Sequence, residues 1–181
     1  MMTFLRKLIA RGFTNQRPAT PAKAPAPLPL TGEEHTALEQ LSALIYRPLA
    51  PNVADTARRT LLSQFEAERE LWIGLQAAND AIACTVYLDV DLKDPESAVG
   101  FAQDIAQLHG LSWMPQQNTP EAVDIVLQTF DIWLAEHGYR FVQLRNVDWG
   151  YAGLVVAQPD LPVLLDLGKR LGTSFEAGCA E

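Results

Sequence analysis

The chain has little cysteine, no long hydrophobic run and no motif of a known enzyme class. Only Cys84 and Cys179 occur among its 181 residues, which is too few for a disulfide framework, so we expect a reducing compartment. No stretch of about 18 apolar residues is present, which argues against a membrane-spanning helix. Nucleotide-binding glycine loops and nucleophile-elbow patterns are missing as well, so the sequence indicates no cofactor.

Acidic residues are absent from the first thirty positions. These positions carry five cations, so the remaining residues must have a net charge of −13 to give the overall charge of −8. Nucleic-acid binding depends on clustered Lys and Arg, so the acidic remainder argues against a nucleic-acid partner. It favours a basic protein partner, or it serves solubility alone.

Residues 1–17 have the pattern of a basic amphipathic helix. Apolar residues occupy one half of the helical wheel and cations the other, the apolar set being Phe4, Leu5, Leu8, Ile9 and Phe13. Three interpretations stay open: a cationic tail without a target, weak contact with an anionic membrane surface, and a targeting or docking peptide. A secretory signal is excluded, because cations interrupt the apolar stretch and no small-residue cleavage site follows.

Residues 18–30 contain five prolines separated mainly by alanine. This composition predicts an extended polyproline linker, which would span roughly 40 Å at about 3.1 Å per residue. We therefore expect a single domain over residues 31–175, followed by a frayed tail over residues 176–181.

Start and stop signals predict about five helices in this domain. The start signals are a capping box of Thr31 and Glu34, the cap Asn52, and the pairs Asp94-Pro95 and Thr119-Pro120. The predicted helices cover about 31–47, 52–75, 94–109, 119–137 and 159–171. Glycine follows three of these helices directly, at Gly110, Gly138 and Gly172.

Period-two hydrophobicity predicts the strands. Residues 81–90 form the clearest candidate, residues 111–114 a short one, and residues 139–145 and 151–157 a hairpin. Together these elements predict an α+β fold: a two-layer domain with a mixed sheet of about four strands that includes the C-terminal antiparallel hairpin. The strand order is not predicted.

Carboxylates gather at the end of the first predicted strand. Asp89 and Asp91 are one residue apart, and oxygen ligands in this arrangement suit a hard cation such as Mg²⁺. Asp94 is a third candidate ligand, although it is also the expected cap of the next helix. Lys93 lies among them, and the same residues are candidates for contact with a partner protein.

The predicted hairpin tip is a second candidate site. Asp148, Trp149 and Tyr151 combine rigid aromatic rings with an acid, a composition typical of protein-binding hot spots. The alternative is that Trp149 folds onto the core. The histidines form no metal set, because His109 and His137 each precede a helix-ending glycine, where a donor meets free carbonyl groups.

Several short motifs resemble a family of small bacterial α+β domains of unknown function, over roughly residues 35–172. The motifs are the strand end LDVDLKDPESA, the helix end HGL, the hairpin FVQLRNVDWGYAGLVVA and the stretch LLDLGKRLG. This chain has Leu92 where the family usually has Trp, and Trp149-Gly150 inserted in its Ser-Asp-x-Tyr hairpin pattern. The resemblance implies no activity.

We therefore expect a cytoplasmic, non-enzymatic protein-binding or accessory domain with an acidic surface. Its N-terminus is a candidate tether to the inner face of the membrane. Two alternatives stay open: a divalent-metal-dependent enzyme that uses Asp89 and Asp91, and an immunity-type inhibitor of a basic toxin.

Overall fold

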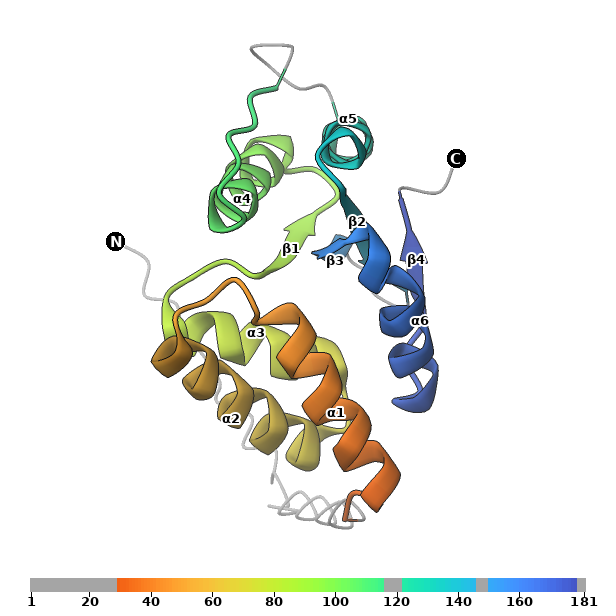
Figure 1. Cartoon of the computed structure of the whole chain (residues 1–181). Helices are drawn as coiled ribbons and strands as arrows, with labels where there is room; N and C mark the ends of the chain where they lie inside the picture. Colours follow the sequence, from red (N-terminus) through yellow and green to blue (C-terminus); the bar gives the residue numbers. More distant parts are fainter. Residues whose placement is uncertain (1–28, 116–121, 146–149, 179–181) are drawn as a thin grey trace, which may run out of the picture.

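A computed structural model describes residues 29–115, 122–145 and 150–178 (Figure 1). The predicted segment 1–17 and most of the predicted linker lie outside these ranges. The helices are α1 (Gly32–Ile45), α2 (Pro51–Glu68), α3 (Leu71–Ile82), α4 (Pro95–Leu108), α5 (Val123–Glu136), the 3₁₀ turn η1 (Gln158–Asp160) and α6 (Leu161–Arg170). The strands are β1 (Tyr87–Asp91), β2 (Tyr139–Leu144), β3 (Gly150–Ala157) and β4 (Phe175–Ala177). No helix in the described ranges is long and apolar enough to cross a membrane.

The α+β class is confirmed, and the four strands form one sheet in the order β1-β3-β2-β4. The predicted β2–β3 hairpin is present, with Tyr139 opposite Ala157. The sheet is not mixed as expected, because all its strand pairs are antiparallel. β1 and β2 run in the same direction, but β3 lies between them, so no parallel pair forms.

Helices pack on both faces of the sheet, so the domain has three layers and not the expected two. α1, α2, α3 and α6 cover one face, and α4 and α5 cover the other (Figure 1). β3 contributes to both sides, with Leu154 in the first hydrophobic cluster and Val155 in the second. A strand buried on both faces is mostly apolar, as β3 is.

Local start and stop signals were predicted correctly at α1 and α4. Thr31 and Glu34 form the reciprocal capping box, with N to O distances of 2.8 and 3.1 Å. Asp94 caps α4 by accepting a hydrogen bond from the Ser97 N–H. Gly110 and Gly138 follow their helices with φ of +73° and +81°, a backbone region that favours glycine.

The predicted second helix is two helices, which explains the sixth α-helix of the described residues. Arg69 adopts φ of 61° and ends α2, and α3 then packs back against it. Gly74 permits this close approach, because a Cβ there would lie 2.7 Å from Leu61 Cδ1. The predicted cap Asn52 was also wrong, since Ala50 is the N-cap of α2 and Pro51 its first residue.

Some strand predictions were wrong for reasons of tertiary packing. β1 begins only at Tyr87, because residues 81 and 82 continue α3. Residues 111–114 form no strand, and their buried Trp113 instead packs against Phe130 of α5, with ring centroids 5.0 Å apart. β4 includes Glu176 and Ala177, which were expected in the frayed tail, and it pairs with β2.

α5 also starts later than expected. Its N-cap is Ala122 and its first residue is Val123, whereas the predicted start signal was Thr119-Pro120. Those two residues lie outside the described ranges. At the N-terminal end of the domain, Leu30 packs against the first hydrophobic cluster, and Arg69 donates a hydrogen bond to the Pro29 carbonyl oxygen at 3.3 Å. The described end of the predicted linker therefore contacts the domain.

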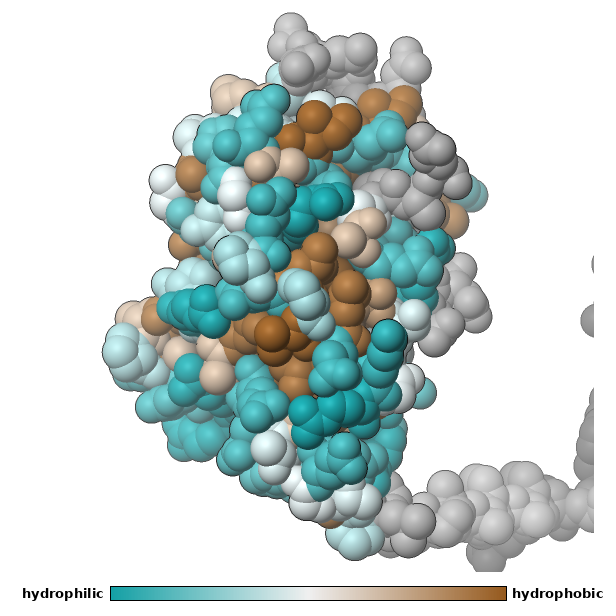
Figure 2. Space-filling model, turned by 45° about the vertical axis from the view of Figure 1, so that its right-hand side comes forward, coloured by the Kyte–Doolittle hydropathy of each residue, from teal (hydrophilic) through white to brown (hydrophobic). Residues whose placement is uncertain are grey.

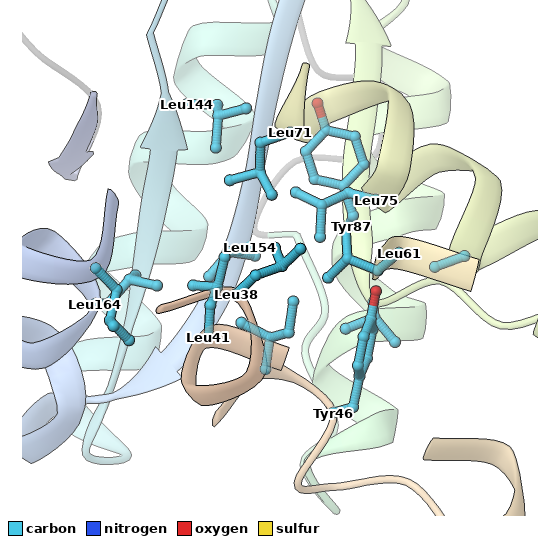
Figure 3. Packing of buried hydrophobic residues seen from close by; sticks show 14 of the residues in the cluster. Leu38, Leu41, Tyr46, Leu61, Leu71, Leu75, Tyr87, Leu144, Leu154 and Leu164 are labelled. Atoms are coloured by element: carbon cyan, nitrogen blue, oxygen red, sulfur yellow. The ribbon is translucent and has the colours of Figure 1, made fainter. Parts of the chain in front are cut away.

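Two tyrosines lie in the core between α1, α2, α3 and the sheet (Figure 3). Tyr46 and Tyr87 are each 1 % exposed, and neither hydroxyl has a hydrogen-bonding partner among the described residues. Burial raises the pKa of both side chains. A buried hydroxyl without a partner has lost its hydrogen bonds to water, which opposes folding.

We expect that Tyr46→Phe leaves the free energy of unfolding unchanged or raises it by up to about 1 kcal/mol, because the substitution keeps the ring and removes only the unpaired hydroxyl. Urea denaturation of the wild type and the variant measures the difference. Tyr87→Phe serves as an independent repeat at the second site. A clear loss of stability in both variants would contradict this expectation, since it would show that the hydroxyls are paired in solution.

Candidate functional site

The carboxylates predicted at the sheet end lie on and beside β1, an edge strand. Asp89 is half-buried and Asp91 is exposed. Leu88 and Val90 point into the cluster under α4 and α5, so Asp89 and Asp91 share the opposite face. The two carboxylates are therefore on one side of the strand, as the sequence predicted.

Asp91 and Asp94, two of the candidate metal ligands, make local hydrogen bonds. Asp91 Oδ1 accepts from the Lys93 N–H at 2.8 Å, and Asp94 accepts from the Ser97 N–H and hydroxyl at 3.0 and 2.6 Å. The Ser97 hydrogen bonds lower the pKa of Asp94, as expected for a helix cap. In the part of the chain that the structure describes, no three His, Cys, Asp or Glu side chains are placed to hold a metal ion.

The two predicted candidate sites do not form one surface. Asp148 and Trp149 lie outside the described residues. Tyr151 belongs to β3, opposite Val90, and packs against the cluster under α4 and α5. It therefore faces the other side of the sheet from Asp89.

Tertiary structure places further acids beside β1. A depression of about 370 Å³ between α3 and β1 includes Asp80 and Asp89, and a second of about 350 Å³ includes Asp104 of α4. The two share residues of the connection before β1, and we call them together the acidic trough. Its residues include Asp80, Ala83, Cys84, Thr85, Asp89 and Asp104.

Three of the residues that line the acidic trough are carboxylates, Asp80, Asp89 and Asp104, and none of the lining residues is a cation. In the sequence, residues 76–108 contain a single cation, Lys93, and six carboxylates: Asp80, Asp89, Asp91, Asp94, Glu96 and Asp104. All six except Asp89 are exposed. Clustered carboxylates beside a low-dielectric surface create a negative potential that attracts cations.

Cys84 lies in this trough but is a poor nucleophile. It is half-buried, and burial together with the charge of Asp104 raises the pKa of its thiol. Because the thiolate is the reactive form, the raised pKa makes this side chain less reactive at neutral pH than an ordinary thiol.

The outer edge of β1 is held at both of its ends. The Asn79 side chain accepts from the N–H groups of Val86 and Tyr87 at 3.0 and 3.3 Å and donates to the Tyr87 carbonyl oxygen at 2.6 Å. At the other end, the Asp94 N–H donates to the Asp91 carbonyl oxygen at 3.1 Å. A partner segment could therefore not add to β1 as a further long strand. It would instead contact the side chains beside this edge.

The histidines have the local positions expected from the sequence. His109 and His137 are the C-cap residues of α4 and α5. The His137 ring lies 2.8 Å from the Trp133 carbonyl oxygen, and the half-buried His35 lies 3.7 Å from Glu39. His109 differs, because it is half-buried at the end of β3 beside Tyr139.

Sequence reasoning missed Asp80 and Asp104 as members of the acidic surface. One lies near the end of α3 and the other in the middle of α4, and β1 separates them along the chain. The excess of acids over residues 76–108 was the available signal. Only the packing of α3 and α4 beside β1 brings the two carboxylates to one trough.

Comparison with known proteins supports the suspected family. A family model described as a domain of unknown function, DUF6630, matches residues 32–178. No curated protein and no solved structure matches the chain. The match covers all the helices and strands described above, and it confirms the resemblance to an uncharacterised domain family. The chain therefore belongs to the DUF6630 family of domains of unknown function.

Proposed function

We propose that the domain binds a basic segment of a partner protein in the acidic trough. The observation that carries the proposal is that the trough is lined by three carboxylates, Asp80, Asp89 and Asp104, and by no cation. Opposite charge speeds encounter and excludes acidic competitors. An immunity-type inhibitor of a basic toxin would be one form of this function, because it would use the same complementarity.

The lining of the trough suits Lys and Arg side chains in particular. Phe101 and Ala83 supply apolar surface beside the half-buried Asp89, with Asp80 at the rim. Lys and Arg bury their aliphatic stems against such surface while the charged end reaches a carboxylate. A basic segment would therefore gain both apolar burial and charge pairing.

Charge reversal tests this proposal. We expect that Asp80→Lys combined with Asp104→Lys weakens binding of a fluorescent oligolysine peptide by about tenfold, which corresponds to about 1.4 kcal/mol. Fluorescence anisotropy measures the affinity, which should also fall as ionic strength rises. Both residues are exposed, so the fold should tolerate the change.

The matched control changes the net charge equally but away from the trough. Asp124→Lys combined with Asp166→Lys reverses two exposed acids on α5 and α6 and should leave the affinity nearly unchanged. If both double variants weakened peptide binding equally, the affinity would depend only on the net charge of the protein. That result, or the absence of binding to the wild type, would remove the trough as the site.

We further propose that residues 1–17 bind weakly to anionic membrane surfaces. Their basic and apolar sequence pattern supports this, as does the general attraction of cations to acidic lipid. The full chain should co-sediment with phosphatidylserine vesicles at low salt and less so at physiological salt. Deletion of residues 1–17 should abolish the binding, whereas equal binding of both forms would contradict the proposal.

A further inference from the structure

A second pocket lies where β1 separates from β3, and we call it the β3-end pocket. β1 pairs with β3 only as far as Leu154, whereas β3 continues to Ala157. The pocket of about 290 Å³ lies beside these last residues of β3, between the ends of α1 and α4. Its apolar lining is Leu44, Pro48, Leu108, Val155, Val156 and Ala157.

Apolar residues are accessible from the surface on one face of the molecule. Figure 2 shows hydrophobic side chains in a hollow near the middle of one face, with hydrophilic residues around it. A lined hollow of this size is therefore a candidate binding site, at the small end of the usual range of about 300–1,000 Å³.

Backbone groups are directed toward this pocket. Both backbone groups of Tyr87 bond to Asn79 on the outer edge of β1, so the opposite residue, Leu154, has its peptide groups turned toward β2. Alternation along the strand then turns those of Val155 toward the side that β1 has left. Ala157 is the N-cap of η1, so its carbonyl oxygen accepts the first hydrogen bond of that turn.

Polar side chains line the pocket without giving it a net charge. The Arg47 guanidinium pairs with the Asp160 carboxylate at 2.7 Å, so their charges balance. Burial lowers the pKa of His109, which is therefore neutral at pH 7 and offers one donor and one acceptor nitrogen. Its ring packs against Tyr139 at 4.7 Å and makes no hydrogen bond to a described residue.

We propose that the β3-end pocket binds a small uncharged molecule that combines an aromatic or branched alkyl group with one hydroxyl or amide group. The apolar walls would take the hydrocarbon part, and the His109 ring would pair with the polar group. A charged ligand is disfavoured, because the ion pair is already balanced and a buried charge without a partner is costly. This ligand site is separate from the proposed partner binding, although Leu108 lines both surfaces.

Titration of the ¹⁵N-labelled full chain with p-cresol tests the proposal. We expect saturable chemical-shift changes at the amides of His109, Tyr139 and residues 155–157 in the millimolar range or below. Benzoate and benzylamine, which carry a charge at pH 7, should bind at least about tenfold more weakly. The absence of saturable changes at these amides, or equal binding of the charged compounds, would overturn the proposal.

Variants separate pocket binding from general contact with the surface. Ala157→Leu should fill the pocket and abolish the p-cresol shifts, and Leu44→Trp is a second filling variant should the first not fold. Ala67→Leu, at an exposed position of α2, is the matched control and should bind like the wild type. If the folded Ala157→Leu or Leu44→Trp variant bound p-cresol as tightly as the wild type does, p-cresol would bind elsewhere on the protein and the proposal would be wrong.

The His109→Phe variant tests the role assigned to the imidazole. It keeps a ring against Tyr139 but loses the polar nitrogens, so it should bind p-cresol no more tightly than it binds toluene.

Discussion

Asp131→Ala is expected to lower the free energy of unfolding by about 3 kcal/mol, because it removes the shared acceptor of three hydrogen bonds and leaves the half-buried Arg140 guanidinium without its partner. Asp131 of α5 is 7 % exposed. Its carboxylate accepts from Arg140 Nε and Nη2 at 3.0 and 2.8 Å and from the Phe141 N–H at 2.8 Å. These bonds connect α5 to the start of β2, and their loss would leave three N–H donors without an acceptor.

Urea denaturation measures this effect. Asp166→Ala makes the same substitution at an exposed site of α6 and should change the stability by no more than about 0.5 kcal/mol. Similar stability of the two variants would show that the Asp131–Arg140 pair contributes little. An unchanged m-value would confirm that both variants unfold from the same folded state.

Asn79→Ala is expected to cost about 2 kcal/mol, because one side chain makes three hydrogen bonds to the backbone of residues 86 and 87. The better helix propensity of Ala in α3 offsets a small part of the loss. Beyond the global effect, the start of β1 should loosen. Hydrogen exchange at the amides of Val86 and Tyr87 should therefore accelerate more than exchange in β2.

Gln76→Ala is the matched control for this variant. Gln76 lies one turn earlier on α3, and its side chain makes a long 3.4 Å hydrogen bond to Asp80 on the same helix. Its removal should leave exchange at β1 unchanged. Equal exchange rates at Val86 in Asn79→Ala and in the wild type would refute the role assigned to Asn79.

Helix ends show how far local sequence reasoning reaches. The capping box of Thr31 and Glu34 and the cap Asp94 were predicted correctly, because each depends on atoms within one helical turn. The break at Arg69 was missed, because no glycine or proline marks it. It follows instead from the packing of Gly74 against Leu61, which requires α3 to reverse direction.

The candidate sites show the same division. Asp89, Asp91 and Asp94 could be found from their spacing, and the structure places Asp91 and Asp94 in local turns and caps. Asp104 could not be assigned to the same surface from the sequence, because α4 had first to be placed beside β1. The β3-end pocket had no sequence signal at all, since Arg47 and His109 lie on different helix ends.

The sequence by itself determined the α+β class, the caps of α1 and α4, the glycines that follow α4 and α5 and the excess of negative charge, because these depend on composition or on hydrogen bonds between near neighbours. Only the tertiary structure decided the antiparallel strand order, the helices on both faces of the sheet, the acidic trough and the β3-end pocket. Each of these requires contacts between segments that are distant along the chain, and packing selects such contacts only when the whole domain folds.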